Sequence, residues 1–490
     1  TGQRRWQPPA PAECWPAGRA LDAAADGPSC YQGGEGGRES EDCLYLNVFA
    51  PPQSLSGRRA AALPVLVFIH GGCNTVGSVS SYGPIENIVA GGELILVAMN
   101  YRLNVFGFLA LAELSAADPR GASGNYAILD QQLALRWVRD NIHAFGGDAG
   151  RVTVAGQSSG GTNVLALLAS VGSRGLFHRA ISLSGSPNLT MDRATKETQD
   201  RELILARTPC KAAADVRACL LDLTAEELHG AMPDSYGYFD TLYDYPVDRR
   251  GLGARVSALP HVDGVTVPRP LQDALRTGLN DVPLLLQSLQ AEMDCAPDAS
   301  LENASAEDVR DWFREKFSPA YGAANAAEIF RRYAEYTDPH PAYAVYALDS
   351  DTAAACGLRE LALAAREGFG SPVYWATVTG APSTTLLAGS RFPFHTWDVV
   401  AATRTWQEFH YQPSASDERF GAMLLGQWVG LARDGRLPDA GWKPVQMAPG
   451  GRTWGSRVEK DRTALVYDPK AEVCRFWRSI GVGQEWWWIN

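Results

Sequence analysis

Apolar residues along this chain gather in short runs that alternate with longer amphipathic stretches. Four runs are rich in Val, Ile and Leu and have the length of buried strands: residues 64–70 (PVLVFIH), 93–99 (ELILVAM), 151–156 (RVTVAG) and 179–185 (RAISLSG). Residues 125–145 between them carry apolar positions at helical spacing and end at two glycines, a common stop signal. Strands that alternate with helices predict a parallel sheet covered by helices on both faces.

The second half of the chain continues this pattern with longer helical stretches. Two further apolar runs, residues 282–288 (VPLLLQS) and 371–380 (SPVYWATVTG), predict strands. Length alone suggests about three domains, but no proline-rich linker, charge block or repeat divides the chain. We therefore expect residues 1–490 to form one domain with insertions.

Composition narrows the class of protein. The chain is 46% hydrophobic and 20% charged, which allows a large core. Its formal net charge of −11 argues against nucleic acid and anionic membrane surfaces as partners. No apolar run approaches the roughly 20 residues of a membrane span, and neither paired Cys-x-x-Cys spacing nor a glycine-rich phosphate loop is present. We expect no membrane span, metal or cofactor.

A glycine-flanked serine lies between one predicted strand and an apolar helical stretch. Residues 156–161 (GQSSGG) follow RVTVA and precede residues 164–170 (VLALLAS). Gly-x-Ser-x-Gly is common in loops, but a strand before it and a helix after it are the context of a nucleophile elbow. Ser158 is the candidate nucleophile, and Ser159 is the neighbouring alternative.

Nine cysteines favour an oxidising environment. Cys30 and Cys43 flank a glycine-rich loop, and Cys210 and Cys219 flank a short polar one, as local disulfides do. Asn188 (NLT) and Asn303 (NAS) lie in possible glycosylation triplets, although such triplets often arise by chance. The sequence starts without a signal peptide, so we interpret it as a mature form or a fragment of a secreted or lumenal protein.

Longer motifs follow one another in a distinctive order: SEDCLYLNVFAP (40–51), FIHGGC (68–73), NYRLNVFGFL (100–109), GNYAILDQQLALRWVRDNIHAFGGD (124–148) and VTVAGQSSGG (152–161). They closely resemble the type-B carboxylesterase and lipase family, to which cholinesterases belong. The likeness continues to the terminal CRFW and covers nearly the whole chain. It implies an α/β-hydrolase fold with a mostly parallel central sheet and insertions over the active site. Such proteins also carry an N-terminal edge hairpin that we expect to be missing here.

The resemblance implies a catalytic triad in the order serine, acid, histidine. Ser158 matches the nucleophile, and His395 in FPFHTWDV matches the base among eight histidines. Glu292 takes the acid position, although the glycine that follows it in the family is Met293 here. Asp294 is the alternative acid.

The resemblance also implies an oxyanion hole and further disulfides. HGGC (70–73) looks like the family's His-Gly-Gly-Gly, which assigns the amide N–H groups of Gly72, Cys73 and Ser159 to the oxyanion. Cys73 replaces the third glycine, so this loop must tolerate a β-carbon. His70 is expected to be structural.

Family disulfides would join Cys210 to Cys219 and Cys356 to Cys474, in addition to the loop closed by Cys30 and Cys43. Cys14, Cys73 and Cys295 remain unassigned. For the last two, free thiols and a Cys73–Cys295 bond both stay open.

The implied activity is hydrolysis of small-molecule carboxylic esters through an acyl-enzyme. Cholinesterases carry a tryptophan in the first disulfide loop, and the loop between Cys30 and Cys43 has none. Gln157 replaces the family's glutamate before the nucleophile, which removes a negative charge. Both features disfavour choline esters. Two alternatives stay open: a catalytically silent recognition or adhesion protein, and a lipase that acts on long-chain lipid esters.

Overall fold

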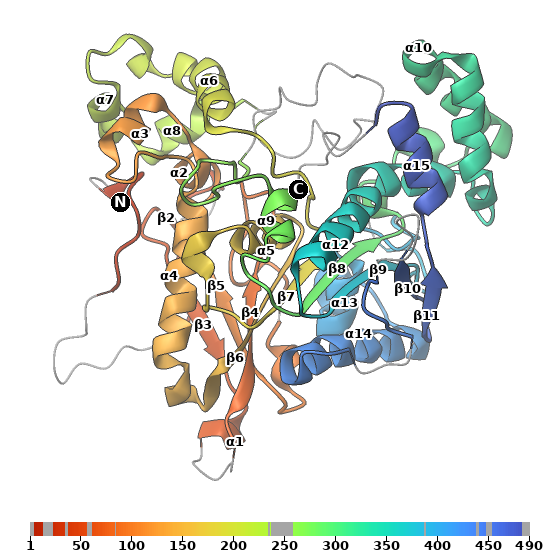
Figure 1. The fold of residues 1–490 in the computed structure, drawn as a ribbon, viewed down its shortest axis with the longest axis horizontal. Coiled ribbons are helices and arrows are strands. Elements are labelled where there is room, and N and C mark those ends of the chain that lie inside the picture. The colour runs from red at the N-terminus through yellow and green to blue at the C-terminus, as the bar shows by residue number, and fades with distance from the viewer. Residues whose placement is uncertain are drawn as a thin grey trace.

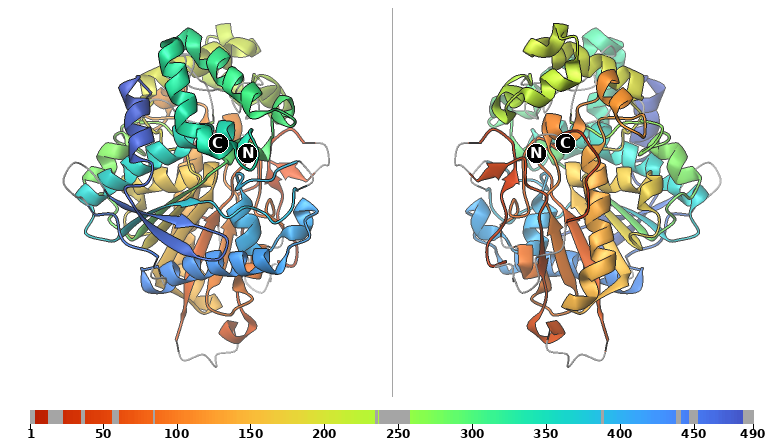
Figure 2. Two further views of the ribbon diagram at one scale, coloured as in Figure 1. Left: turned by 90° about the vertical axis from the view of Figure 1, so that its right-hand side faces the viewer. Right: turned by 90° about the vertical axis from the view of Figure 1, so that its left-hand side faces the viewer.

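A nine-stranded sheet forms the centre of the molecule, with helices on both faces (Figures 1 and 2). The structure is a computed structural model, and it describes residues 4–12, 23–34, 38–55, 61–83, 85–233, 236, 258–386, 389–437, 441–446 and 453–482.

The sheet has the order β11-β10-β9-β8-β7-β6-β4-β5-β3. Its strands are β3 (Leu46–Phe49), β4 (Leu63–Ile69), β5 (Ile95–Met99), β6 (Gly147–Gln157), β7 (Arg179–Leu183), β8 (Leu284–Leu289), β9 (Val373–Val378), β10 (Trp454–Val458) and β11 (Thr463–Tyr467). Strands β4 to β10 run parallel, whereas β3 and β11 pair antiparallel at the two edges. The prediction of a mostly parallel α/β sheet is confirmed.

Alternation along the strands supplies both faces of the core. In β4, Val65, Val67 and Ile69 belong to one apolar cluster, and Leu66 and Phe68 belong to the other. The first face is covered by α4 (Tyr126–Asn141), α5 (Ser159–Leu168), α9 (Leu271–Arg276) and α12 (Cys356–Gly368). The second is covered by α13 (Trp397–Thr403) and α14 (Ala415–Asp434). Side chains of a strand alternate between the two faces of the sheet, and helices cover both faces. Every residue of β4 is therefore buried.

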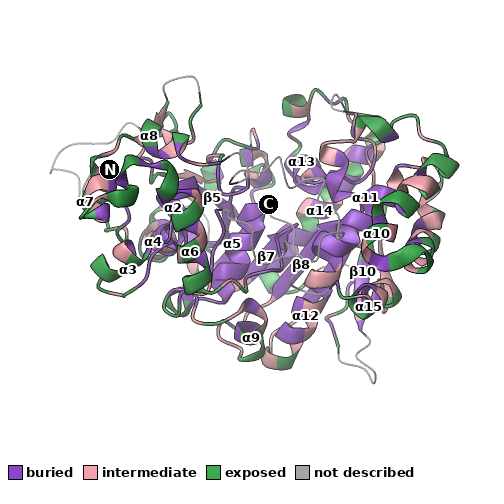
Figure 3. Cartoon of the chain, turned by 90° about the horizontal axis from the view of Figure 1, so that it is seen from above, coloured by how far each residue is buried: buried purple, intermediate pink, exposed green. Residues whose placement is uncertain are grey.

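Helical insertions flank the sheet on two sides. Seen from above, α6 (Arg193–Leu203), α7 (Val216–Asp222) and α8 (Ala225–Gly230) lie on one side of the buried strands, and α10 (Ala306–Tyr333), α11 (Tyr343–Ser350) and α15 (Ala471–Ser479) lie on the other (Figure 3). The second group buries its own apolar cluster, which includes Phe313, Phe317 and Trp477. The α10 helix is interrupted at Gly322, where φ is 79°. The shorter elements are β1 (Ser29–Cys30), β2 (Glu39–Ser40), α1 (Pro52–Leu55), α2 (Asn104–Phe108) and α3 (Ala112–Ala117).

Three disulfides join the cysteine pairs that the sequence predicts: Cys30–Cys43, Cys210–Cys219 and Cys356–Cys474. Neither Cys73 nor Cys295 takes part in a disulfide among the described residues, so the alternative bond between them is not formed. Cys14 lies outside the described residues. None of the described helices combines the length and the apolar character that a membrane crossing requires.

Candidate active site

Ser158 occupies a sharp turn between β6 and α5. Its backbone has φ 62° and ψ −131°, a conformation that L-residues rarely adopt, and its N–H donates to Leu183 O at 2.8 Å. The turn depends on glycine, because a Cβ on Gly160 would lie 2.1 Å from the carbonyl oxygen of Ile69. The sequence therefore folds here into the strand–turn–helix unit that holds a serine at the carboxyl end of a strand.

His395 and Glu292 form a buried pair beside this turn. His395 Nδ1 lies 2.7 Å from Glu292 Oε2, and the two side chains are 6% and 0% exposed. The other carboxylate oxygen accepts from Ser184 Oγ at 2.8 Å and from the N–H of Leu289 at 2.7 Å. Three donors thus compensate a fully buried carboxylate, as burial of a charge requires.

Asp294, the alternative acid, has different partners. Its Oδ2 accepts from the backbone N–H groups of Arg391 and Phe392 at 2.6 and 2.8 Å. Burial raises the pKa of Asp294 to about 6. The carboxylate thereby fastens the segment that leads to His395 and does not contact the ring nitrogen that Glu292 holds.

A third buried carboxylate, that of Asp398, lies three residues after His395. It accepts from Gln287 Nε2 at 2.6 Å and from the N–H of Val399 at 2.9 Å. Burial raises its pKa to about 6, and the charge of Glu292 acts in the same direction. The resemblance assigned no role to Asp398 or to Gln287.

The residue before the serine also reaches the imidazole. Gln157 Nε2 lies 3.1 Å from His395 Nε2, and Gln157 Oε1 accepts from the hydroxyl of Tyr82 at 2.6 Å. This contact brings the imidazole to the turn at Ser158. A substitution at position 157 was evident in the sequence, but neither this contact nor Tyr82 was predicted.

The loop after β4 carries the predicted oxyanion donors. Gly72 and Cys73 have φ values of 104° and 57°, so the loop does hold a β-carbon in the left-handed region. Among the described residues, the N–H groups of Gly72, Cys73 and Ser159 donate to no protein acceptor. Burial raises the pKa of the Cys73 thiol, which keeps it protonated.

Side chains around this loop fix its position. The N–H of Asn74 donates to Ser159 Oγ at 3.0 Å, so this hydroxyl, for which no use was predicted, joins the loop to α5. His70 stacks on Tyr101 with ring centroids 4.5 Å apart. Burial lowers the pKa of His70 to about 4, which agrees with the expected structural role of a neutral histidine.

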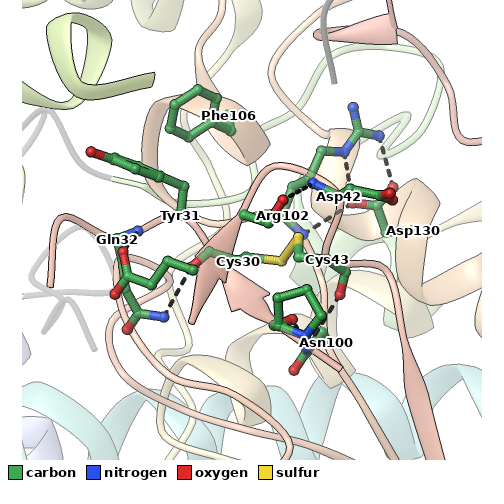
Figure 4. Close-up of a disulfide and its surroundings, with 12 residues drawn as sticks. Cys30, Tyr31, Gln32, Asp42, Cys43, Asn100, Arg102, Phe106 and Asp130 are labelled. Carbon is green, nitrogen blue, oxygen red and sulfur yellow. Dashed lines mark hydrogen bonds and ion pairs between the residues drawn. A yellow bond between two sulfur atoms is a disulfide. The ribbon is translucent and has the colours of Figure 1, made fainter. Parts of the chain in front are cut away.

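Side chains around the first disulfide bond to the segment that follows this loop, and Figure 4 shows the Cys30–Cys43 bond with Gln32 and Asn100 beside it. Gln32 accepts from the N–H of Gly77 at 2.8 Å and donates to its carbonyl oxygen at 3.2 Å. Asn100 accepts from the N–H of Val79 and donates to Cys43 O. Tyr31, the aromatic residue between the two cysteines, packs edge-on against Phe106. The disulfide loop therefore supports the oxyanion loop through side-chain amides.

The chemistry available here is that of a nucleophile with a general base. Ser158 follows β6, Glu292 follows β8 and His395 follows β9, at the carboxyl edge of the sheet. Of the candidate oxyanion donors, Gly72 and Cys73 follow β4, and Ser159 begins α5. A search of the described residues finds no cluster of His, Cys, Asp and Glu able to hold a metal ion.

Comparisons with known proteins agree with this architecture. The family model described as "Carboxylesterase family" matches residues 1–477. Para-nitrobenzyl esterase of Bacillus subtilis (strain 168) is 44% identical over 205 residues, 39% of this chain and 39% of that protein. Liver carboxylesterase 1 of Oryctolagus cuniculus is 37% identical over 245 residues, 46% of this chain and 41% of that protein. These aligned regions therefore span about two fifths of each relative.

The structural likeness extends over more of the chain. A solved PNB esterase superimposes with a TM-score of 0.73 at 26% identity, covering 97% of this chain and 92% of that one. A thermophilic PNB esterase gives a TM-score of 0.74 at 25% identity, covering 97% and 93%. The family match, the shared fold and the arrangement of the site lead to one conclusion. The chain belongs to the carboxylesterase family.

Proposed function

We propose that this protein is a serine hydrolase that cleaves carboxylic esters of small molecules. The observation that carries the proposal is the buried 2.7 Å contact between His395 Nδ1 and Glu292 Oε2, next to the strained turn at Ser158. A serine hydroxyl attacks an ester only when a nearby base takes its proton, and a carboxylate on the far ring nitrogen keeps that base correctly oriented.

In the proposed reaction, Ser158 Oγ attacks the carbonyl carbon while its proton passes to His395 Nε2. Glu292 stabilises the imidazolium through Nδ1. The tetrahedral intermediate then collapses: the bond to the alcohol oxygen breaks, and Nε2 returns its proton to that oxygen. Water attacks the acyl-enzyme with the same nitrogen as base, which releases the acid and restores the serine.

The oxyanion of the intermediate is assigned to the N–H groups of Gly72, Cys73 and Ser159. Among the described residues these N–H groups donate to no protein acceptor, which supports this role, since donors placed in advance need no rearrangement when charge develops. The N-terminus of α5, at Ser159, adds a favourable dipole.

The test is covalent labelling of the serine. A phosphonylating reagent should modify Ser158 stoichiometrically and stop turnover of a para-nitrobenzyl ester, a substrate suggested by the name of one relative. Ser158→Ala should prevent both. A label on Ser159, or on no serine, would contradict the assignment.

The labelling experiment and a comparison of esters of different chain length separate the alternatives. A silent recognition protein would fold normally, resist the reagent and leave every ester intact. A lipase would turn over long-chain ester emulsions faster than short-chain p-nitrophenyl esters, a possibility kept open by the 33% identity over 297 residues to Lipase 5 of Diutina rugosa.

We also propose that the protein works in a secreted or lumenal compartment. Three disulfides support this view, because such bonds persist in oxidising environments. Asn303 is exposed and suits a glycan, whereas Asn188 is buried and does not. Non-reducing peptide mapping of the protein from its native source should recover all three bonds, and free thiols at these six positions would contradict the assignment.

A further inference from the structure

A line of hydrogen bonds runs from the oxyanion loop to the imidazole of His395. The N–H of Gly71 donates to the Tyr82 hydroxyl oxygen at 2.9 Å. Tyr82 lies 2.6 Å from Gln157 Oε1, and Gln157 Nε2 lies 3.1 Å from His395 Nε2. On its other side, the ring meets Glu292.

The direction of the bonds in this line follows from their donors. A backbone N–H can only donate, so the Tyr82 hydroxyl oxygen accepts from Gly71, and its hydrogen is donated to Gln157 Oε1 at 2.6 Å. The amide group that faces His395 is therefore NH₂, which also can only donate. His395 Nε2 must accept, so its proton is on Nδ1 and is donated to Glu292.

Burial keeps this arrangement from reversing. Gln157 is 1% exposed and Tyr82 is 8% exposed. A turned amide would set its oxygen against the Nε2 lone pair and its NH₂ group against a hydroxyl hydrogen. Unpaired buried polar groups of this kind cost about 1–3 kcal/mol each.

We propose that Gln157 is a positioning residue that holds resting His395 as the neutral Nδ1–H tautomer and opposes protonation of Nε2. The inference rests on the proposed function for its effect on turnover. Protonation of the ring, by solvent at low pH or by Ser158 during turnover, would set an Nε2–H against the NH₂ group of Gln157, and one of them would have to move. The base therefore stays available at lower pH than it would with an acceptor at position 157.

The charged groups around the ring act in the opposite direction. Glu292 after β8 contacts Nδ1, and Asp398 on α13 is close enough to interact with both Glu292 and His395. Asp349 on α11 lies near Glu292, and burial raises its pKa. Burial also raises the pKa of Tyr82, so its hydroxyl stays neutral. The Glu292 carboxylate, and Asp398 when it is ionised, favour a positive ring, whereas the amide of Gln157 disfavours it.

The first test is the pH profile of kcat/KM. Gln157→Glu replaces the donor by an acidic acceptor of nearly equal shape, so the acidic limb should move up by about one pH unit or more. Gln157→Met removes the donor without adding charge, and Tyr82→Phe frees the amide to turn. Both should move the limb up by less.

Tyr333→Phe is the matched control. Tyr333 is also a buried tyrosine with two hydrogen-bond partners, Trp477 and Asp351, and belongs to the cluster under α10. The Tyr333→Phe substitution should leave the acidic limb of the pH profile unchanged. A limb that stays put or moves to lower pH in Gln157→Glu would overturn the inference, even if the rate falls.

A second readout requires no turnover. The downfield proton resonance of Nδ1–H can be followed by NMR in Ser158→Ala protein and assigned by its loss in His395→Ala. The midpoint of the pH titration of this resonance should shift up by about one pH unit when Gln157→Glu is added to Ser158→Ala. A protein that titrates in this way but hydrolyses no ester would contradict the proposed function alone. Ester turnover with no shift in either readout would overturn this inference alone.

Discussion

Glu292 and Asp294, two of the buried carboxylates near His395, differ in the groups that they contact. Glu292 contacts the ring nitrogen, and Asp294 holds the backbone that precedes the ring. The sequence left both open as the acid because Met293 breaks the family pattern between them. In the structure, Glu292 and Asp294 differ in their contacts with the segment 391–395, about a hundred residues further along the chain. No local sequence pattern encodes contacts at that separation.

This difference predicts unequal losses of activity. Glu292→Gln should lower kcat by about 10²–10⁴, because the amide favours the wrong tautomer of the base. Asp294→Asn keeps an oxygen for Arg391 and Phe392, so its kcat should fall by less than about tenfold. Ester turnover by both variants, with circular dichroism as the control for folding, measures the effect. The reverse order would identify Asp294 as the acid.

Cys73 carries a side chain where the backbone suits glycine. Its φ of 57° costs a residue with a β-carbon about 1 kcal/mol, and its thiol is buried. Cys73→Gly should therefore retain much of the activity, because the proposed donor is main chain. Cys73→Val should lose most of it, since a β-branched residue is a poor fit for this region. Steady-state kinetics on folded variants provides the test, and an inactive, folded Cys73→Gly would mean that the thiol has a chemical role.

At the scale of elements, the disulfide loop and the oxyanion loop behave as one unit. Gln32 bonds to both backbone groups of Gly77, five residues after Gly72. Gln32→Ala removes both bonds and should lower kcat by about tenfold, the equivalent of roughly 1.4 kcal/mol lost in positioning the loop. Gln412→Ala, at an exposed glutamine, is the control and should change nothing. Equal kcat values in the two variants would show that the loops are independent.

The predicted elements were those with strong apolar runs. Strands β4 to β9 have such runs because helices cover both of their faces. Strands β10 and β11 were not predicted, since β10 contains Gly455 and the exposed Arg457, and β11, at the edge of the sheet, has only half-buried and exposed positions. Similarly, the elbow was evident from its glycines, whereas the contact of Gln157 with His395 spans 238 residues and has no local signature.

At the scale of the molecule, one disulfide closes far more chain than the others. Cys356–Cys474 spans 118 residues, and Cys210–Cys219 spans 9. The loop-entropy relation predicts about 5 kcal/mol of stabilisation for the long link and about 2.5 kcal/mol for the short one. Replacing each pair by alanines should therefore lower the urea midpoint more for the long link. Equal midpoints would mean that the entropy of the unfolded chain does not dominate.

The strand order bears on how the chain acquires its chemistry during synthesis. From β6 to β11, each new strand pairs with the strand made just before it, so the sheet grows outward as the chain emerges. The turn at Ser158 needs only β4, β6 and β7, whereas Glu292 and His395 arrive after β8 and β9. On the proposed mechanism, a nascent chain folded only as far as β7 therefore holds the serine without its base. We expect it to be inert toward esters until the segments that carry Glu292 and His395 are in place.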